Sequence, residues 1–242
     1  MLLCAFVPLW QSKRHTTFLF LYFCNSTIPH MNIHSFTFNP FEENTYIVYD
    51  ETNQCAIIDP GCYMPEEEEE LLQFIEDKKL NPILLLNTHC HVDHIFGNKL
   101  IYDKFGLSPQ CHKNELQLLE AAGEYSKQWG IFLKTSPAPE KFLDETDTIT
   151  IGNQTFLILL TPGHSPGSLC FYHQNEKVII AGDVLFQMSI GRFDLPGGNE
   201  QTLLSSIKEK LMPLPADVKV YPGHGPATTI GFEKMYNPFL LR

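Results

Sequence analysis

The segment Thr88–His94, which reads THCHVDH, limits the possible folds of this chain more than any other part of it. It carries three imidazoles and one carboxylate, at His89, His91, Asp93 and His94. Neutral imidazole and ionised carboxylate are ligands that borderline cations such as zinc accept. A single zinc takes about four ligands, and on an extended loop the first two histidines can point away from the last two side chains. The spacing therefore predicts two adjacent metal ions.

Three later segments supply further candidate ligands, each directly after an apolar run that reads as a strand. FLILL precedes TPGHSPGS with His164, KVIIA precedes GDVLF with Asp183, and DVKVY precedes PGHGP with His224. An aspartate in this position can bridge two ions through its carboxylate oxygens. The surrounding glycines and prolines permit sharp turns and leave space for a substrate. We therefore expect these three loops to meet the first one at a single site.

The order HxHxDH, His164, Asp183, His224 resembles the metallo-beta-lactamase fold superfamily, and the resemblance extends from about Asn32 to the C-terminus. TPGHSPGS, GRFDLPGG at Gly191–Gly198, YPGHGPATTIG and the later NPF are similar to the glyoxalase II-like hydrolases. Among these, the short form of hydroxyacylglutathione hydrolase is the nearest in pattern. The resemblance implies an alpha/beta fold of four layers, the alpha-beta-beta-alpha sandwich, with the metals at one edge between the sheets.

The resemblance also implies two divalent metal ions, with zinc favoured over iron or manganese. One ion would be held by His89, His91 and His164, and the other by Asp93, His94 and His224, with Asp183 shared. Asp93 and Asp183 are the expected catalytic carboxylates. Between ions about 3.5 to 4 Å apart, a bridging water becomes hydroxide near neutral pH and can attack an acyl carbonyl.

The implied substrate is a small acyl thioester such as S-lactoylglutathione, because a thiolate leaves with little help from an acid. Eighteen residues follow His224 (242 minus 224). We therefore expect no counterpart of the C-terminal helical domain that supplies glutathione contacts in the long form. Two alternatives remain open: a persulfide dioxygenase with a single iron on the same fold, or another hydrolase of the superfamily, such as a lactonase or a beta-lactamase.

Several residues outside the ligand set have predicted roles. Asp59 in IIDPG matches the acidic residue that closes an early strand in the superfamily, and we expect it to orient a ligand histidine or the metal loop. Arg192 either binds a substrate carboxylate or forms an ion pair with Asp194. Cys90 is expected to pack into the fold, and His112 to cap a helix or lie at the surface.

The bulk composition fits one soluble domain over residues 31–242. The chain has 242 residues and is 43% hydrophobic, enough for a sizeable core. Its 28 acidic against 17 basic residues give a net charge of -11, which argues against a nucleic-acid partner. The seven cysteines are scattered and contain no CxxC, which is typical of reduced thiols in a cytoplasmic protein.

The first thirty residues differ from the rest. Ser12–Arg14 is polar and basic, and the apolar run Phe18–Cys24 is shorter than the roughly 20 residues that span a bilayer. No clean cleavage site follows it. We expect residues 1–30 to be an N-terminal extension outside the fold, with Met31 as the start of the functional protein and no membrane partner; a targeting segment is the alternative.

The remaining pattern predicts two runs of strands accompanied by helices, which suggests two sheets packed face to face. The predicted strands are 33–38, 45–49, 55–59, 82–86, 148–151, 155–160, 168–172, 177–181 and 218–221. Helices are predicted from Pro65 to about Lys79, with Glu66–Glu70 as a solvated face, and over 95–105, 114–128, 200–211 and 232–236.

Overall fold

The computed structural model describes residues 31–241. The expectations for residues 1–30, as an extension or as a targeting segment, concern residues outside this range. Within the described range, no helix is both long enough and apolar enough to cross a membrane.

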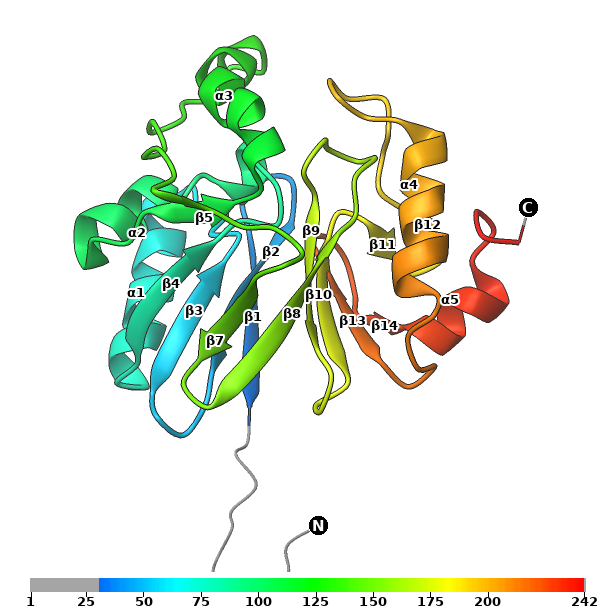
Figure 1. Cartoon of the computed structure of the whole chain (residues 1–242). Coiled ribbons are helices and arrows are strands. Elements are labelled where there is room, and N and C mark those ends of the chain that lie inside the picture. Colours follow the sequence, from blue (N-terminus) through cyan, green and yellow to red (C-terminus); the bar gives the residue numbers. More distant parts are fainter. Residues whose placement is uncertain (1–30, 242) are drawn as a thin grey trace, which may run out of the picture.

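The first sheet has six strands and is built from residues 32–142 (Figure 1). Its order is β1 (Asn32–Phe38), β2 (Glu43–Tyr49), β3 (Gln54–Ile58), β4 (Asn81–Leu86), β5 (Pro109–Cys111) and β6 (Lys141–Phe142). The first three strands are antiparallel, and β3 to β6 run parallel. The helices on this side are α1 (Pro65–Asp77), α2 (Asn98–Phe105) and α3 (Leu116–Gln128).

The second sheet also has six strands, in the order β14 (Thr228–Thr229), β13 (Lys219–Pro222), β10 (Val178–Gly182), β9 (Leu169–His173), β8 (Gln154–Leu160) and β7 (Thr148–Ile151). Its outer face carries α4 (Glu200–Ser206), which continues as a π-helical turn over Ile207–Leu211, and α5 (Ile230–Tyr236). A separate hairpin, β11 (Leu185–Phe186) and β12 (Ser189–Ile190), follows β10.

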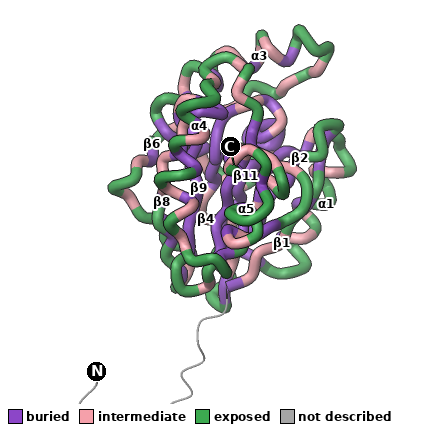
Figure 2. The backbone as a smooth tube through the Cα atoms, turned by 90° about the vertical axis from the view of Figure 1, so that its right-hand side faces the viewer, coloured by how far each residue is buried: buried purple, intermediate pink, exposed green. Residues whose placement is uncertain are grey.

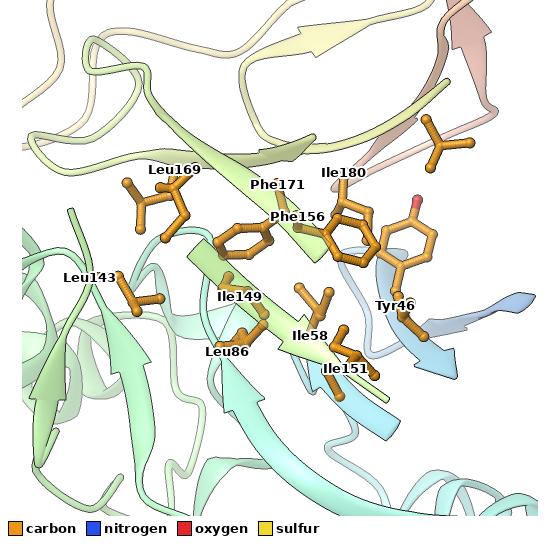
Figure 3. Close-up of a cluster of buried hydrophobic side chains, with 14 of the residues drawn as sticks. Tyr46, Ile58, Leu86, Leu143, Ile149, Ile151, Phe156, Leu169, Phe171 and Ile180 are labelled. Carbon is orange, nitrogen blue, oxygen red and sulfur yellow. The ribbon is translucent and has the colours of Figure 1, made fainter. Parts of the chain in front are cut away.

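The core between the sheets follows from the two-residue period of the strands. In β2, Tyr46 and Val48 belong to the central cluster, whereas Ile47 packs on the opposite face with the residues under α1 and α2. Phe156 and Phe171 of the second sheet meet this cluster from the other side (Figure 3). Each such aromatic or aliphatic side chain contributes about 1.5 to 3 kcal/mol when fully buried.

Two further apolar clusters lie under the outer helices, one against each sheet. The tube coloured by burial shows the result: purple strands lie inside, and the green and pink segments lie around them (Figure 2). Helices, two sheets and helices thus form four layers. The predicted alpha-beta-beta-alpha sandwich is confirmed.

Strand direction explains where the polar loops meet. In the second sheet β9 is antiparallel to both β8 and β10, and β13 is parallel to β10, so β8, β10 and β13 end at the same edge. In the first sheet β3 and β4 are parallel and likewise end together. At this edge Asn44 of β2 donates through Nδ2 to the carbonyl oxygens of Pro222 and Gly225. The sheets are therefore joined beside the loops that carry the predicted ligands.

The structure corrects two details of the predicted α1. The helix ends at Asp77, and Lys78 is its C-cap, so the last turn carries no basic residue. The glutamates were expected to form a solvated face, but Glu67 accepts hydrogen bonds from the backbone of Asn39, Tyr63 and Met64. Glu67 therefore fixes the start of the helix and the loop after β1.

Candidate metal centre

A first group of three imidazoles draws on both sheets: His89 and His91 follow β4, and His164 follows β8. Nε2 of His164 lies 2.8 Å from Nδ1 of His91 and 3.2 Å from Nε2 of His89. Because Nδ1 of His164 donates to the carbonyl oxygen of Arg192, its Nε2 carries a single lone pair and cannot bond both neighbours. A cation at the centre of the group would attract all three lone pairs.

A second group consists of Asp93, His94 and His224, again from both sheets. Nε2 of His224 lies 3.2 Å from Oδ2 of Asp93, and Nε2 of His94 lies 3.7 Å from the same oxygen. Asp183 lies between the two groups. Its Oδ1 is 3.5 Å from Nε2 of His94, and its Oδ2 is 3.5 Å from Nε2 of His164. The seven predicted ligands therefore lie together, with Asp183 facing both groups.

Most of these imidazoles are oriented through the nitrogen that points away from the centre. Nδ1 of His224 donates to the carbonyl oxygen of Phe41 at 2.9 Å, and Nδ1 of His94 donates to Oδ2 of Asp59 at 3.1 Å. Metal-binding histidines in proteins commonly make such an outer hydrogen bond, which fixes the tautomer and the ring orientation. Here the bonds direct Nε2 of both rings toward the carboxylates of Asp93 and Asp183.

Asp59 takes the position expected of an orienting carboxylate. Its Oδ1 accepts from the backbone N–H of Thr88 at 2.7 Å, and its Oδ2 accepts from the Thr88 hydroxyl at 2.5 Å. Asp59 also lies near His89 and His94 in a cluster that could hold an ion. Both of its oxygens are already occupied by hydrogen bonds, however, so it supports the two histidines from behind.

The electrostatic environment suits metal ligands in the first group and at Asp183, and it favours positive charge at His94 in the second group. Burial lowers the pKa of His89 well below its usual value and that of His91 to about 3, so both rings are neutral. Burial alone would lower the pKa of His94, but the Asp93 and Asp183 carboxylates outweigh it and raise that pKa well above its usual range. Burial opposes ionisation of Asp183, yet the neighbouring His94 lowers the Asp183 pKa. Neutral imidazoles and ionised carboxylates are the forms that bind metal, so His89, His91 and Asp183 are ready to bind an ion, whereas His94 must lose its proton when an ion binds.

Two observations test whether the residues fit a metal. Nε2 of His94 and Oδ1 of Asp183 are buried without a hydrogen-bond partner among the described residues, and such groups are rare in proteins without a ligand. Gly223 leaves the space for them, because a Cβ there would lie 2.1 Å from Oδ1 of Asp183 and 2.8 Å from Cε1 of His94. The donor set and its surroundings therefore fit divalent metal ions.

Comparison with known proteins agrees with this geometry. The model of the metallo-beta-lactamase superfamily matches residues 38–224, a range that contains every side chain of both groups. The chain belongs to the metallo-beta-lactamase superfamily. It is therefore a metallo-hydrolase by family, and members of this superfamily bind divalent metals.

Individual members of the superfamily resemble almost the whole described range. Hydroxyacylglutathione hydrolase GloC of Haemophilus influenzae is 39% identical over 212 residues, which cover 87% of this chain and 98% of the relative. The crystal structure of the B3 metallo-beta-lactamase BLEG-1 has a TM-score of 0.80 and 38% identity and covers 87% of this chain and 100% of that one. The structure of TTHA1623 in a di-iron-bound form has a TM-score of 0.78 and 37% identity, covering 86% and 100%.

Two buried glutamates beside the site, Glu43 and Glu115, were not predicted from the sequence. Glu43 at the start of β2 is fully buried; its Oε2 accepts from the Thr45 hydroxyl, and its Oε1 lies 3.7 Å from Nδ1 of His94. Burial raises the Glu43 pKa well above its usual value. Glu43 and Asp59 thus approach the same nitrogen of His94 from two strands.

Glu115, just before α3, connects two ligand loops. Its Oε2 accepts from the backbone N–H of Cys90 at 2.8 Å, within the HxHxDH segment. Its Oε1 accepts from the Ser165 hydroxyl at 2.7 Å and from the Gly167 N–H at 2.6 Å, next to His164. One buried carboxylate therefore fixes the relative positions of the two loops that form the first imidazole group.

A cavity of about 440 Å³ opens directly over both groups. Ligand sites in proteins commonly fall between about 300 and 1,000 Å³. Asp93, Asp183, His91, His164 and His224 contribute to its floor, and apolar side chains form most of its walls. The candidate ligands are therefore accessible to a small molecule.

The structure also places the three other residues singled out in the sequence, Arg192, Cys90 and His112. Arg192 lines the cavity and pairs with Asp194 through two hydrogen bonds of 2.9 Å. Cys90 is 1% exposed and packs in the cluster under α3. Nδ1 of His112 accepts from the Asn114 N–H and so caps a short helical turn, which is one of the two roles predicted for it.

Proposed function

We propose that the chain is a dinuclear metal-dependent hydrolase of acyl thioesters, with S-lactoylglutathione as the reference substrate. The observation that carries this proposal is the position of Asp183. Its two oxygens face separate ligand groups, at 3.5 Å from Nε2 of His94 and 3.5 Å from Nε2 of His164, on the floor of a ligand-sized cavity.

In this proposal His89, His91 and His164 hold one ion, Asp93, His94 and His224 hold the other, and Asp183 is shared. Zinc is favoured because imidazole and carboxylate are its usual ligands, with iron and manganese as alternatives. When bound, a pair of such ions activates water as a nucleophile and polarises a carbonyl oxygen. The catalytic unit is residues 31–242, since every proposed ligand lies there.

The side chains define where the substrate reacts. Asp93 and Asp183 present carboxylates at the cavity floor, and the proposed ligand histidines point their free nitrogens toward them. The acyl carbonyl must therefore lie against this floor, with the rest of the substrate along the cavity walls. No acidic side chain is required on the leaving-group side, because a thiol pKa near 8.5 makes thiolate a good leaving group.

Similarity to GloC, named as a hydroxyacylglutathione hydrolase, supports the thioesterase assignment, since the two chains align over nearly their whole length. A second candidate is beta-lactam hydrolysis. It is favoured by the 38% identity to BLEG-1, named as a B3 metallo-beta-lactamase, and by complete coverage of that structure. Both reactions add water to an acyl carbonyl and need the same floor.

The test combines metal analysis with a substrate panel. Full-length protein is purified and loaded separately with zinc and with iron, and bound metal per chain is measured. Each form is assayed with S-lactoylglutathione, an uncharged thioester, a lactone, a beta-lactam and glutathione persulfide, the last with oxygen uptake. We expect about two ions per chain and thioester hydrolysis. One ion per chain with full activity, or faster turnover of persulfide by the iron form, would contradict the proposal.

A further inference from the structure

One wall of the cavity is an aromatic face built on α3 and the β1–β2 loop. Leu118, Tyr125 and Trp129 line it at spacings of seven and four residues, which place them on one side of the helix and its C-cap. The Phe41 ring completes the wall, with its centroid 5.9 Å from that of Trp129. Phe41 also accepts the His224 hydrogen bond through its carbonyl, so the wall is fixed directly beside a proposed ligand.

The opposite wall is aliphatic and aromatic as well. Phe186 and Ile190 come from the β11–β12 hairpin, and Leu195 comes from the loop that follows it. The hairpin is held by a buried acid, because Oε2 of Glu233 accepts from the Met188 N–H at 3.0 Å. Both sides of the cavity above the metal groups therefore offer apolar surface.

Apart from the proposed metal ions at the floor, this cavity has little positive charge. Among its described lining residues, Arg192 is the one lysine or arginine. Its guanidinium is bound to Asp194 by two hydrogen bonds, and the side chain is 59% exposed. The glutathione part of a thioester carries two carboxylates, and a carboxylate moved out of water without a partner is strongly penalised.

The aromatic wall is also left open to solvent at the cavity mouth. Trp129 is 54% exposed and Phe41 39% exposed, although both are large apolar side chains. Exposed apolar surface that borders a cleft is a common mark of a ligand-binding groove. A ligand that covers these rings gains the free energy of burying them, and an apolar ligand gains most.

We infer that the cavity selects uncharged, apolar acyl thioesters in preference to glutathione thioesters, with Phe41 and Trp129 as specificity-determining residues. This inference rests on the proposed thioesterase function. The acyl carbonyl lies at the floor, and an aromatic or aliphatic substituent lies against the Phe41–Trp129 wall. Arg192, neutralised by Asp194, contributes little to recognition of an anion.

A binding measurement tests the inference without turnover. The full chain has two tryptophans, Trp10 and Trp129, so Trp10→Phe leaves Trp129 as the sole tryptophan, which is excited selectively at wavelengths where tyrosine does not absorb. Two thioethers that cannot be hydrolysed serve as quenching probes: S-(4-nitrobenzyl)-N-acetylcysteamine, which is uncharged, and S-(4-nitrobenzyl)glutathione. Since the aromatic group is the same, the difference reports the thiol part. We expect at least about tenfold tighter binding of the uncharged probe.

A turnover measurement uses the same design, with phenylacetyl thioesters of N-acetylcysteamine and of glutathione and the metal-loaded full chain. We expect kcat/KM to be at least about tenfold higher for the uncharged thioester. Trp129→Ala should raise its KM about threefold to tenfold, in line with the loss of one aromatic contact. Phe132→Ala is the matched control, because Phe132 is 75% exposed and lies outside this cavity.

The outcomes separate the inference from the function on which it rests. Equal or tighter binding of the glutathione thioether, or equal effects of Trp129→Ala and Phe132→Ala on KM, would overturn the apolar selectivity. If neither thioester is hydrolysed while the uncharged thioether still binds preferentially, the thioesterase function fails and the selectivity of the cavity stands.

Discussion

The carboxylate of Asp59 accepts a hydrogen bond from Nδ1 of His94, at 3.1 Å and across 35 positions of sequence. The same oxygen accepts from the Thr88 hydroxyl, whose oxygen lies 3.0 Å from Nδ1 of His89. One oxygen therefore orients a histidine in each of the two proposed ligand groups. Asp59 adopts this position with a positive φ of 49°, an uncommon conformation for a residue other than glycine.

Asp59→Asn should lower metal affinity about 10- to 100-fold, the usual effect of removing an outer partner of a metal-binding histidine. The asparagine oxygen can still accept from the Thr88 backbone, but its amide would point a donor at the Nδ1–H of His94. Zinc titration against a competing chelator measures the change. Asp50→Asn is the control, since Asp50 is also buried but binds the turn at Thr52 and Asn153. Unchanged metal affinity in Asp59→Asn would show that Asp59 does not orient the histidines for metal binding.

Asp183→Ala should reduce bound metal from about two ions per chain to about one and lower kcat roughly 10³-fold, because stabilisation by metal ions is worth several kcal/mol. The fold should survive, as this loop carboxylate is no part of the central core. Metal analysis and circular dichroism check both statements. Asp194→Ala is the control. Asp194 is an exposed ion-pair partner of Arg192 near the site, and this variant should keep both ions. Two bound ions per chain in Asp183→Ala would contradict the proposal that the two ions share Asp183.

Glu115→Gln should destabilise the fold by about 1 to 3 kcal/mol, the penalty for a buried group without its partner. Glutamine has one acceptor oxygen, and its amide nitrogen only donates, so it cannot accept from both sets of donors that Glu115 now binds, at Cys90 and at Ser165 and Gly167. Urea unfolding measures the loss. Glu120→Gln, at an exposed position of the adjoining helix α3, provides the baseline. Equal stability of the two variants would mean that Glu115 does not hold the ligand loops together.

His173→Asn should flatten the decline of stability in acid. Nδ1 of buried His173 accepts from the Glu176 N–H, and burial lowers its pKa below the ordinary 6.5. The unfolded chain therefore binds the proton first, so this contribution is complete above pH 6.5 and is lost as pH falls toward the lowered value. Asparagine retains an acceptor but does not titrate. Between pH 7.5 and 5.5 the unfolding free energy of His173→Asn should fall less steeply than that of the unchanged protein; parallel curves would assign the acid sensitivity elsewhere.

The sequence predicts the large elements well, because long strands of a two-layer core carry a repeating pattern. The strand at Thr148–Ile151 has the predicted bounds, and β1 and β8 differ from them by one residue. The two-residue strands β6, β11, β12 and β14 were not predicted. A strand of two residues has no periodicity, and its position depends on a neighbour that is distant in sequence.

The candidate site, too, was predicted only in part. Motif spacing and resemblance placed seven side chains that the structure brings together, because each lies in the segment that follows a strand. Glu43 and Glu115 were missed. Each is a single acidic residue in an ordinary context, and Glu115 meets its partners 25 to 52 positions away. Tertiary structure alone distinguishes a buried carboxylate of this kind from a solvated one.

Each proposed ligand group takes side chains from both sheets, two from the loop after β4 and one from the second sheet. An ion bound by either group would therefore cross-link the two halves of the sandwich at one edge. Separation of the sheets would then require loss of metal first, so the unfolding rate should fall as free metal rises. Hydrogen exchange in the central strands should therefore slow as metal occupancy rises. In a metal-poor cell, the lifetime of the protein would depend on the supply of metal.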